Sequence, residues 1–280
     1  MARTPRDRAP RTTSAAPASA GRRTGNRRRY SQNFLTDPAV ARAVVRASGV
    51  GPADTVWEVG AGEGMITRHL LPACAHLTAY EIDPRLAATL RRRFGGRVRV
   101  VRADFRTAHP PSAPFHVVGN IPYAITAAIV DWCLAAPSLR SATLVTQLEY
   151  ARKRTGGFGR WSRLTVLHWP RFDWRMGPRI HRDRFTPVPR VDSAVLLLRR
   201  RDRPLLPREA LGEYRRLVET GFTGVGGSLR ASLRTAAPVR RVDAALAWAG
   251  VPRGALVAEV SPDQWVRLFA HLHRLEPGTG

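Results

Sequence analysis

Residues 56–65 read Val-Trp-Glu-Val-Gly-Ala-Gly-Glu-Gly-Met, a pattern that predicts a buried strand, a glycine-rich turn and the start of a helix. In α/β proteins, ligands bind beyond the carboxyl ends of the strands, where glycines let the backbone approach closely. The glycine spacing, E-x-G-x-G-x-G, differs from the dinucleotide fingerprint G-x-G-x-x-G, so it disfavours NAD. The stretch therefore indicates a ligand site of another kind, unless it is only a tight strand–helix turn.

Apolar β-rich runs alternate with amphipathic helical runs, which is typical of a mostly parallel sheet covered on both faces. The expected strands are residues 55–59, 77–82, 98–103, 115–119, 142–147, 164–168 and 191–198. The expected helices are residues 38–48, 65–71, 84–94, 124–135 and 149–154. After the proline-rich stretch 203–207 only helical patterns follow, at 208–222, 239–249 and 262–275. We therefore expect an α/β domain over residues 30–204 and a small all-α domain over residues 205–280.

Acidic residues lie at the ends of three successive expected strands, at Glu58, Glu81 and Asp104. A carboxylate after the second strand can accept both ribose hydroxyl hydrogens. One after the third can accept from the exocyclic amine of adenine while Phe105 packs on the ring. Each acid alone is more often a solvated carboxylate or a helix cap, as we expect for Asp83 before a proline. Together they suggest a cofactor that carries a nucleoside.

The fourth expected strand ends in Asn120-Ile121-Pro122-Tyr123, which combines a planar amide, a proline-fixed backbone and an aromatic ring. An exocyclic amine attacks poorly because its lone pair is delocalised into the ring. Acceptors on its two hydrogens, the Asn120 side-chain oxygen and a backbone carbonyl near Ile121, favour a pyramidal nitrogen whose lone pair can attack. Tyr123 can stack on the base. The pattern therefore predicts an amine nucleophile on a base.

Positive charge is concentrated in two parts of the 280-residue chain, which has 46 Lys+Arg, 21 Asp+Glu and a net charge of +25. Residues 1–29 carry a net +8 and lack large apolar side chains, so we expect a disordered basic arm; an organellar transit peptide is the alternative. Residues 150–204 carry +11, whereas residues 30–149 and 205–280 carry +3 each. This uneven charge indicates a polyanionic partner, nucleic acid first, rather than an arginine-rich background.

Other signals exclude several classes of site. Cys74 and Cys133 form no C-x-x-C pair, which fits reduced thiols in a cytoplasmic protein. No apolar run approaches the roughly 18 residues of a membrane helix. The histidines do not cluster, and His271 and His273 face different ways on an expected helix, so we expect no metal. We expect a cytoplasmic monomer that makes no membrane contact.

Six motifs occur in the order found in S-adenosylmethionine-dependent rRNA adenine N6-methyltransferases, a family that this chain resembles over residues 30–198. The motifs are Ser31-Gln32-Asn33-Phe34-Leu35, residues 58–64, Glu81-Ile82-Asp83, Ala103-Asp104-Phe105, residues 120–123 and residues 185–195. The resemblance implies a Rossmann-like class I methyltransferase domain, a small all-α domain after it, and S-adenosyl-L-methionine as cofactor. It also implies that a target adenine leaves its stack and that N6 attacks the sulfonium methyl in line.

The resemblance assigns roles to the residues that match these motifs. It implies cofactor contacts for Gln32, Asn33, Leu35, Gly60, Gly62, Gly64, Glu81, Ile82, Asp104, Phe105 and Asn120. It implies that the target adenine lies against Asn120, Ile121, Pro122 and Tyr123, with Phe185 on its other face. The alternative for Phe185 is a core aromatic ahead of a proline-rich turn.

Two branches of the family compete for this chain. Residues 147–162, Gln-Leu-Glu-Tyr-Ala-Arg-Lys-Arg-Thr-Gly-Gly-Phe-Gly-Arg-Trp-Ser, resemble erythromycin-resistance (Erm) methyltransferases of the actinobacterial type. Housekeeping members usually read Gln-Lys-Glu-Val-Ala at the start of this stretch. The Erm branch implies methylation of one adenine of 23S rRNA, before or during ribosome assembly, and macrolide-lincosamide-streptogramin B resistance. The alternatives are a housekeeping 16S rRNA adenine dimethyltransferase and a non-catalytic nucleic-acid-binding relative.

RNA contacts are expected from the basic arm and from the basic stretch 150–204. The candidates are Arg27, Arg28, Arg29, Arg152, Lys153, Arg154, Arg160, Arg163, Arg182 and Arg184. Trp161 lies in the same stretch and could equally touch RNA or fill the core.

Overall fold

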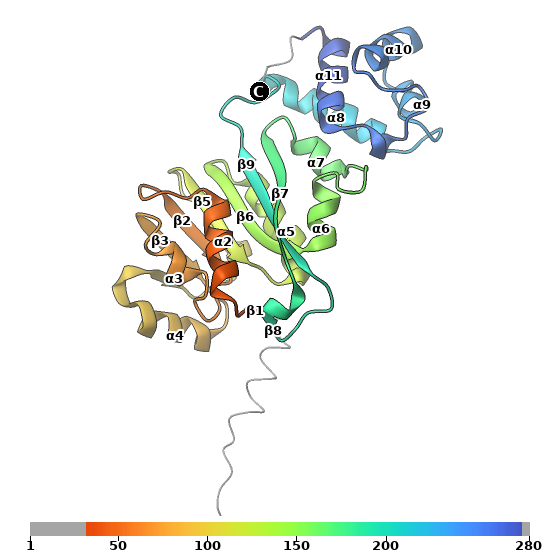
Figure 1. Ribbon diagram of the computed structural model, residues 1–280. Coiled ribbons are helices and arrows are strands. Elements are labelled where there is room, and N and C mark those ends of the chain that lie inside the picture. Colours follow the sequence, from red (N-terminus) through yellow and green to blue (C-terminus); the bar gives the residue numbers. More distant parts are fainter. Residues whose placement is uncertain (1–31, 276–280) are drawn as a thin grey trace, which may run out of the picture. The chain divides into compact units, whose positions relative to one another are not determined.

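The computed structural model describes residues 32–275 and contains a seven-stranded sheet followed by a group of helices (Figure 1). The strands are β2 (Thr55–Val59), β3 (His76–Tyr80), β4 (Arg99–Val101), β5 (Phe115–Asn120), β6 (Leu139–Gln147), β7 (Phe172–Ile180) and β9 (Ser193–Arg200). Their order is β4-β3-β2-β5-β6-β9-β7, in which β4 to β6 run parallel and β9 is antiparallel to both its neighbours. The expected α/β class with a mostly parallel sheet is confirmed.

The direction in which strands are added reverses beside β2. After β2 the chain places β3 and β4 on one side, and it then returns to place β5 and β6 on the other. In open α/β sheets, ligands bind at the carboxyl ends of the strands next to such a reversal. The glycine-rich turn after β2 and Asn120 at the end of β5 both lie at this position.

Two helices that cover the sheet begin at the same Asp-Pro signal. Asp37 and Asp83 accept the backbone N–H two residues on, and each is followed by proline at the first helical position. The resulting helices, α2 (Pro38–Ser48) and α4 (Pro84–Phe94), have the predicted bounds. Three further helices of this part are α3 (Thr67–Leu70), α5 (Thr126–Ala135) and α6 (Leu148–Arg154).

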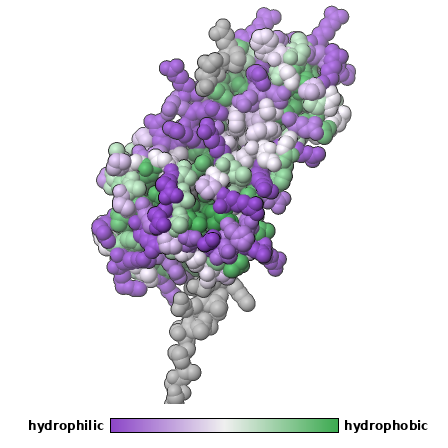
Figure 2. Space-filling model, viewed as in Figure 1, coloured by the Kyte–Doolittle hydropathy of each residue, from purple (hydrophilic) through white to green (hydrophobic). Residues whose placement is uncertain are grey.

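Apolar side chains form two clusters. One joins the sheet to α2, α3 and α4, where Val44, Leu70 and Leu90 are fully buried. The other lies under α5, contains Phe105 and Phe115, and continues into the helices that follow the sheet. On the face drawn in Figure 2, apolar side chains (green) gather near the middle of the α/β part, with hydrophilic ones (purple) around them.

One expected strand is wrong. Residues 164–168 lie in the helix α7 (Arg163–His168), which Ser162 caps through its hydroxyl group. The strand that sequence analysis missed is β7, an edge strand with several exposed side chains, Pro178 and an irregular register against β9. A five-residue apolar run fits a strand and a helical turn equally, and an edge strand with a proline lacks a continuous apolar pattern.

The helices after β9 bury side chains of their own. They are α8 (Leu211–Gly221), the unexpected α9 (Leu229–Leu233), α10 (Val239–Trp248) and α11 (Pro262–His273). Trp265 of α11 is fully buried. This group is tied to α7, because Tyr214 donates to the carbonyl oxygen of Val166 (2.9 Å) and the Trp169 indole donates to Asp263 (2.7 Å). One apolar cluster runs through both parts, so the boundary at residues 204 and 205 stays a prediction.

No helix between residues 32 and 275 is both long and apolar enough to cross a membrane. Over the same residues, no three or more His, Cys, Asp and Glu side chains gather in a way that could hold a metal ion. Neither cysteine forms a disulfide; Cys133 is buried, and desolvation raises the pKa of Cys74 to about 11. Cys133 packs in the core, whereas Cys74 is partly buried and its thiol donates to the carbonyl oxygen of Leu70 (3.2 Å).

Candidate active site

The glycine-rich turn closes directly against the next strand. The N–H groups of Gly60 and Ala61 both donate to the carbonyl oxygen of Tyr80 at the end of β3 (3.0 and 3.2 Å). Gly60 has a φ of 68°, and a Cβ atom there would lie 3.3 Å from the carbonyl oxygen of Asn120. Glycine is therefore favoured by the left-handed backbone and by the close approach of β5. The turn brings the ends of β2, β3 and β5 together.

Glu81, directly after β3, is held by the backbone around this turn. Its two carboxylate oxygens accept the N–H groups of Gly62 (2.8 Å) and Asp83 (2.9 Å), and the residue is 2% exposed. Burial raises the pKa of Glu81, and the N–H donors partly offset this rise. Because a carboxylate oxygen can accept more than one hydrogen, this group can hold a ribose diol in a fixed place.

Glu58, on β2, is fully buried behind the turn. Desolvation raises the pKa of Glu58 to about 8, while Thr67 at the start of α3 lowers it and the nearby Glu81 carboxylate raises it. The Glu58 carboxyl group is therefore mainly protonated at neutral pH. It lines the same pocket as Gly60 and Asn120.

Asp104, after β4, is paired with an arginine. Its carboxylate accepts from the backbone N–H of Arg106 (2.9 Å) and from the Nε (3.0 Å) and Nη2 (2.5 Å) of the same residue. The hydrogen bonds from the Arg106 guanidinium hold the pKa of Asp104 below its usual range. The Arg106 side chain is exposed to solvent, so it can move aside without disturbing the core. An adenine amine bound here must compete with Arg106 for the Asp104 oxygens.

Phe105 and Ile82 differ in their accessibility. Phe105 is buried, with its ring centre 4.4 Å from that of Trp132 and 5.2 Å from that of Tyr80. Ile82 is 41% exposed next to Glu81. Of these two residues, Ile82 therefore offers the accessible apolar surface for a bound ring, and Phe105 packs in the core. The cofactor contact predicted for Phe105 stays a prediction.

Asn120 ends β5 with its amide held in one orientation. The Nδ2 group donates to the backbone carbonyl oxygen of Asn33 (2.8 Å), which is 87 residues away in the chain. Only the nitrogen of the amide can make this bond, so Oδ1 lies on the opposite side as an acceptor. The segment around Asn33 also lines the pocket through Phe34 and Leu35. Sequence analysis did not predict this contact, because a backbone carbonyl leaves no mark in the sequence.

Tyr123 is anchored by β9. Its hydroxyl oxygen lies 2.7 Å from that of Ser193, which is fully buried at the start of β9. Desolvation raises the pKa of Tyr123, so the phenol is neutral. Pro122 and the buried Ile121 constrain the backbone between Asn120 and this ring. The motif thus presents one acceptor and one ring in a fixed arrangement.

Phe185 lies in the core. It forms the strand β8 (Phe185–Thr186), which pairs antiparallel with β1 (Phe34–Leu35). The residue is 1% exposed and belongs to the same apolar cluster as Ile180 and Val195. This placement supports the core alternative, because contact with a target base requires the ring to leave this cluster.

The predicted cofactor residues converge on one edge of the sheet. One pocket is lined by Phe34, Leu35, Glu58, Gly60, Ala61, Gly62, Glu63, Met65, Ile66 and Asn120. Glu81 is hydrogen-bonded to its wall through Gly62, and Asp104 lies one strand further along. Gly64 has a packing role, since a Cβ atom there would lie 2.7 Å from the Phe94 ring. Gln32 is half-buried, and its cofactor contact stays a prediction.

Some of the predicted RNA-binding side chains are accessible. Lys153, Arg160 and Arg163 are exposed, and no carboxylate within residues 32–275 forms an ion pair with them. The Arg152 guanidinium lies 5.8 Å from the ring centre of Phe158, which is 54% exposed and was not predicted. The described part of the chain does not include Arg27, Arg28 and Arg29.

Other predicted RNA-binding side chains are engaged within the protein. Arg154 packs over the ring of Tyr150, 4.7 Å from its centre. Arg184 forms an ion pair with Asp37 (2.9 Å), and Arg182 donates to a backbone carbonyl in the following loop (3.4 Å). These three arginines are therefore poorer candidates for RNA contact than their place in the basic stretch indicates.

Trp161 is partly buried and packs against the core. Its ring centre lies 5.7 Å from that of Trp169, and a Cβ atom at Gly156 would lie 2.5 Å from the ring. Its backbone N–H donates to the carbonyl oxygen of Ala258 (2.7 Å) in the helical part. These contacts favour the core alternative over direct contact with RNA.

This chain is similar to known proteins of one family in sequence and in fold. The sequence matches the family described as ribosomal RNA adenine dimethylase over residues 23–274. It is 53% identical to an rRNA adenine N-6-methyltransferase of Saccharopolyspora erythraea, over 91% of this chain and 68% of that protein. The crystal structure of the 23S rRNA methyltransferase ErmE matches with a TM-score of 0.84 and 53% identity, covering 86% of this chain and 100% of that one.

Two further relatives have other names. The mycinamicin-resistance protein MyrB of Micromonospora griseorubida is 37% identical, over 91% of this chain and 81% of that protein. The ribosomal RNA small subunit methyltransferase A of Thermobifida fusca is 38% identical, over 79% of this chain and 81% of that protein. Identity is thus higher to ErmE than to the small-subunit enzyme. With the Rossmann-like methyltransferase fold and the ordered motifs around Asn120, these matches show that the chain belongs to the ribosomal RNA adenine dimethylase family.

Proposed function

We propose that this protein methylates N6 of an adenine in 23S rRNA with S-adenosyl-L-methionine, and that this modification confers macrolide-lincosamide-streptogramin B resistance. The observation that carries the proposal is the Asn120 amide, whose acceptor oxygen is oriented by the Asn33 carbonyl at the edge of the pocket. The 53% identity to the 23S rRNA methyltransferase ErmE favours the large-subunit substrate. The name of MyrB supports a resistance phenotype.

The residues at the sheet edge fit S-adenosylmethionine. Glu81 would hold the ribose hydroxyls, and Asp104 would accept from the adenine amine after Arg106 has moved aside. Ile82 offers an exposed apolar surface to the adenine ring. Leu35 would bound the part of the pocket that lies against the glycine-rich turn. When bound, the cofactor supplies an electrophilic methyl group on a positively charged sulfur.

The end of β5 would activate the target amine. Asn120 Oδ1 accepts one hydrogen of the adenine amine, and the backbone carbonyl near Ile121 accepts the other, so that the lone pair is drawn out of conjugation with the ring. Tyr123 stacks on the base and fixes its plane. The chain thus contributes alignment and polarisation of the amine. Rigid anchors on both sides, Asn33 and Ser193, keep these groups in place.

No side chain is required as a strong base. The amine nitrogen becomes acidic only after it has gained the methyl group, and its proton can then pass to solvent. Glu58, a buried carboxyl group that lines the pocket, is consistent with this, because its raised pKa keeps it mainly protonated. Its role would be to shape the pocket.

The RNA would approach along the surface of α6 and the loop after it. α6 begins directly after the carboxyl end of β6, the parallel neighbour of β5, so it lies at the same sheet edge as Asn120. This segment carries the exposed Lys153, Arg160 and Phe158, which offer charge for phosphates and a ring for a base. Monomeric action on rRNA, before or during ribosome assembly, fits such a surface.

Mapping of rRNA methylation in a macrolide-sensitive bacterium tests the proposal. Cells that express the protein should contain a methylated 23S rRNA adenine and should tolerate macrolides. Cells that express Asn120→Ala should show neither, while the purified variant should still fold and unfold cooperatively. A methylated 16S rRNA adenine without resistance would instead identify a housekeeping enzyme. RNA binding without any methylation would identify a non-catalytic relative.

A further inference from the structure

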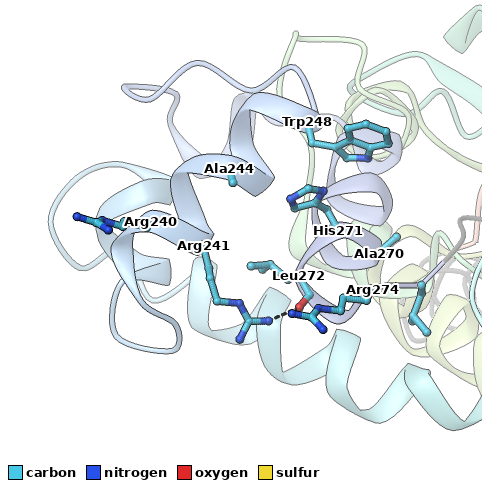
Figure 3. Close-up of a pocket in the computed structure, with 9 residues that line it drawn as sticks. Arg240, Arg241, Ala244, Trp248, Ala270, His271, Leu272 and Arg274 are labelled. Atoms are coloured by element: carbon cyan, nitrogen blue, oxygen red, sulfur yellow. Dashed lines mark hydrogen bonds between the residues drawn. The ribbon is translucent and has the colours of Figure 1, made fainter.

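The helical part carries an exposed aromatic pair that the methyl-transfer site does not use. Trp248, at the end of α10, is 62% exposed. One face of its indole lies on His271 of α11, with ring centres 5.6 Å apart and planes 29° from parallel (Figure 3). The contact with His271 fixes the orientation of the indole and leaves its remaining surface accessible to solvent.

This aromatic pair lies in a cationic cavity. The cavity has a volume of about 490 Å³ and is lined by Arg240, Arg241, Ala244, Trp248, Ala270, His271, Leu272, Arg274 and Leu275. None of these lining residues is acidic. The Arg241 guanidinium donates to the carbonyl oxygen of Leu272 (2.5 Å), which holds it at the cavity wall (Figure 3).

The charge in the cavity is not neutralised by neighbouring acids. Asp243 lies on the same helix but pairs with Arg230 (2.5 Å) and Arg253 (3.2 Å). Over residues 32–275, no carboxylate forms an ion pair with Arg240 or Arg274. The cavity therefore presents uncompensated positive charge beside an exposed indole.

Arg274 has a backbone conformation that disfavours arginine. It caps α11 with a φ of 53° and a ψ of 39°, and it is the only non-glycine residue with positive φ in the described part of the chain. Glycine is the usual residue at such a cap and is found at the equivalent position of α2, Gly49. An arginine that is unfavourable for the backbone indicates that its side chain is used.

We propose that this cavity is a second RNA-binding site, in which Trp248 stacks on an unpaired base and Arg241 and Arg274 contact the adjacent phosphates. An exposed aromatic ring flanked by arginines is how proteins hold single-stranded nucleic acid. Apolar lining from Ala244, Leu272 and Leu275 lies beside the arginines, so the cavity suits the face of a base next to its phosphate. This proposal depends on the proposed function in one respect, which is that the partner is RNA.

Binding of a labelled oligouridylate to the full-length protein tests this site. The probe contains no adenine, so the result does not depend on methyl transfer. Trp248→Ala should weaken binding about tenfold, within the range for loss of one stacked base, and Trp248→Phe should restore most of the affinity. Arg274→Gly should also weaken binding and should reduce the salt dependence by about one phosphate contact.

The stability of Arg274→Gly separates an RNA role from a structural one. Glycine relieves the left-handed cap, so this variant should melt at the same temperature as the wild type or higher. The matched control is Arg234→Ala, which removes an exposed arginine of the same helical part that does not line the cavity. It should change affinity less than twofold.

Three outcomes would overturn the proposal. Trp248→Ala and Arg274→Gly could bind like the wild type, or they could lose no more affinity than Arg234→Ala. Arg274→Gly could also melt at a lower temperature, which would make the arginine a structural residue. If the wild type bound the probe through Trp248 but methylated no rRNA, only the proposed function would fail.

Discussion

The hydrogen bond between Tyr123 and Ser193 allows the ring and the hydroxyl of the tyrosine to be tested separately. The two oxygens are 2.7 Å apart, and Ser193 is fully buried. Tyr123→Phe keeps the aromatic surface and leaves the serine hydroxyl buried without this partner. A buried polar group that loses its partner costs about 1–3 kcal/mol.

The expected stability changes follow from the burial of the two residues. Tyr123→Phe should destabilise the protein by about 2 kcal/mol, or about 4–8 °C in melting temperature at this chain length. Ser193→Ala should cost less, about 1 kcal/mol, because Tyr123 is less completely buried than Ser193 and its hydroxyl can reach water more easily. The double variant should be destabilised by about 1 kcal/mol less than the sum of the two single destabilisations. Urea denaturation of all four proteins measures this coupling.

Methyl transfer to an rRNA fragment measures the role of the ring. Tyr123→Phe should keep kcat within about tenfold of the wild type, because the stacking surface remains, whereas Tyr123→Ala should lose up to about a hundredfold. Additive stability changes would show that the two hydroxyls do not interact. Equal losses of activity in Phe and Ala variants would show that the hydroxyl, and not the ring, is needed, and would refute the stacking role.

Three further predictions concern the pocket and the RNA surface. Glu81→Gln turns one acceptor into a donor that faces the N–H of Gly62 or Asp83, so cofactor affinity should fall about 10–100-fold in a calorimetric titration, with melting temperature changed by only a few degrees. Glu58 has a folded-state pKa of about 8, above its unfolded value, so its protonated form stabilises the folded state at low pH, and this stabilisation is lost as the pH rises to about 8. Glu58→Gln should therefore flatten the pH dependence of the free energy of unfolding over this range. An unchanged slope would contradict the assignment. Neutralising the exposed side chains of Lys153, Arg160 and Arg163 should weaken rRNA binding and should lower its salt dependence by an amount equal to about two to three phosphate contacts, while cofactor affinity stays constant. Equal losses of RNA and cofactor affinity would refute the separation of the RNA surface from the cofactor pocket.

Sequence patterns located the site because its parts depend on local chemistry. Asp37 and Asp83 each precede a proline, and this pair of signals sets a helix start without help from the rest of the fold. Glu81 and Asn120 follow apolar strands, and parallel strands bring their carboxyl ends to one edge whatever the loops between them. Alternation and strand ends therefore predicted that Glu81 and Asn120 lie at one edge of the sheet, whereas their contacts with the cofactor stay predictions.

Other features depend on contacts between distant parts of the chain. Phe105 and Phe185 both belong to the family motifs, but Phe105 lies under α5 and Phe185 pairs with β1, and no local pattern separates a buried ring from an exposed one. The sequence predicts that Arg184 contacts RNA, but the fold pairs it with Asp37, which is 147 residues away in the chain. Residues 164–168 are too few for their periodicity to distinguish a helix from a strand.

The insertion of β9 between β6 and β7 has a consequence for synthesis of the protein. The ribosome synthesises the chain from its N-terminus, so β7 emerges before β9, the strand that must lie between β7 and β6. The anchor of Tyr123 also belongs to β9, at Ser193. A nascent chain that ends before residue 193 can bury neither β7 nor the Tyr123 hydroxyl in their final places. We therefore expect the enzyme to become competent only late in its own translation, after most of the sheet has already formed.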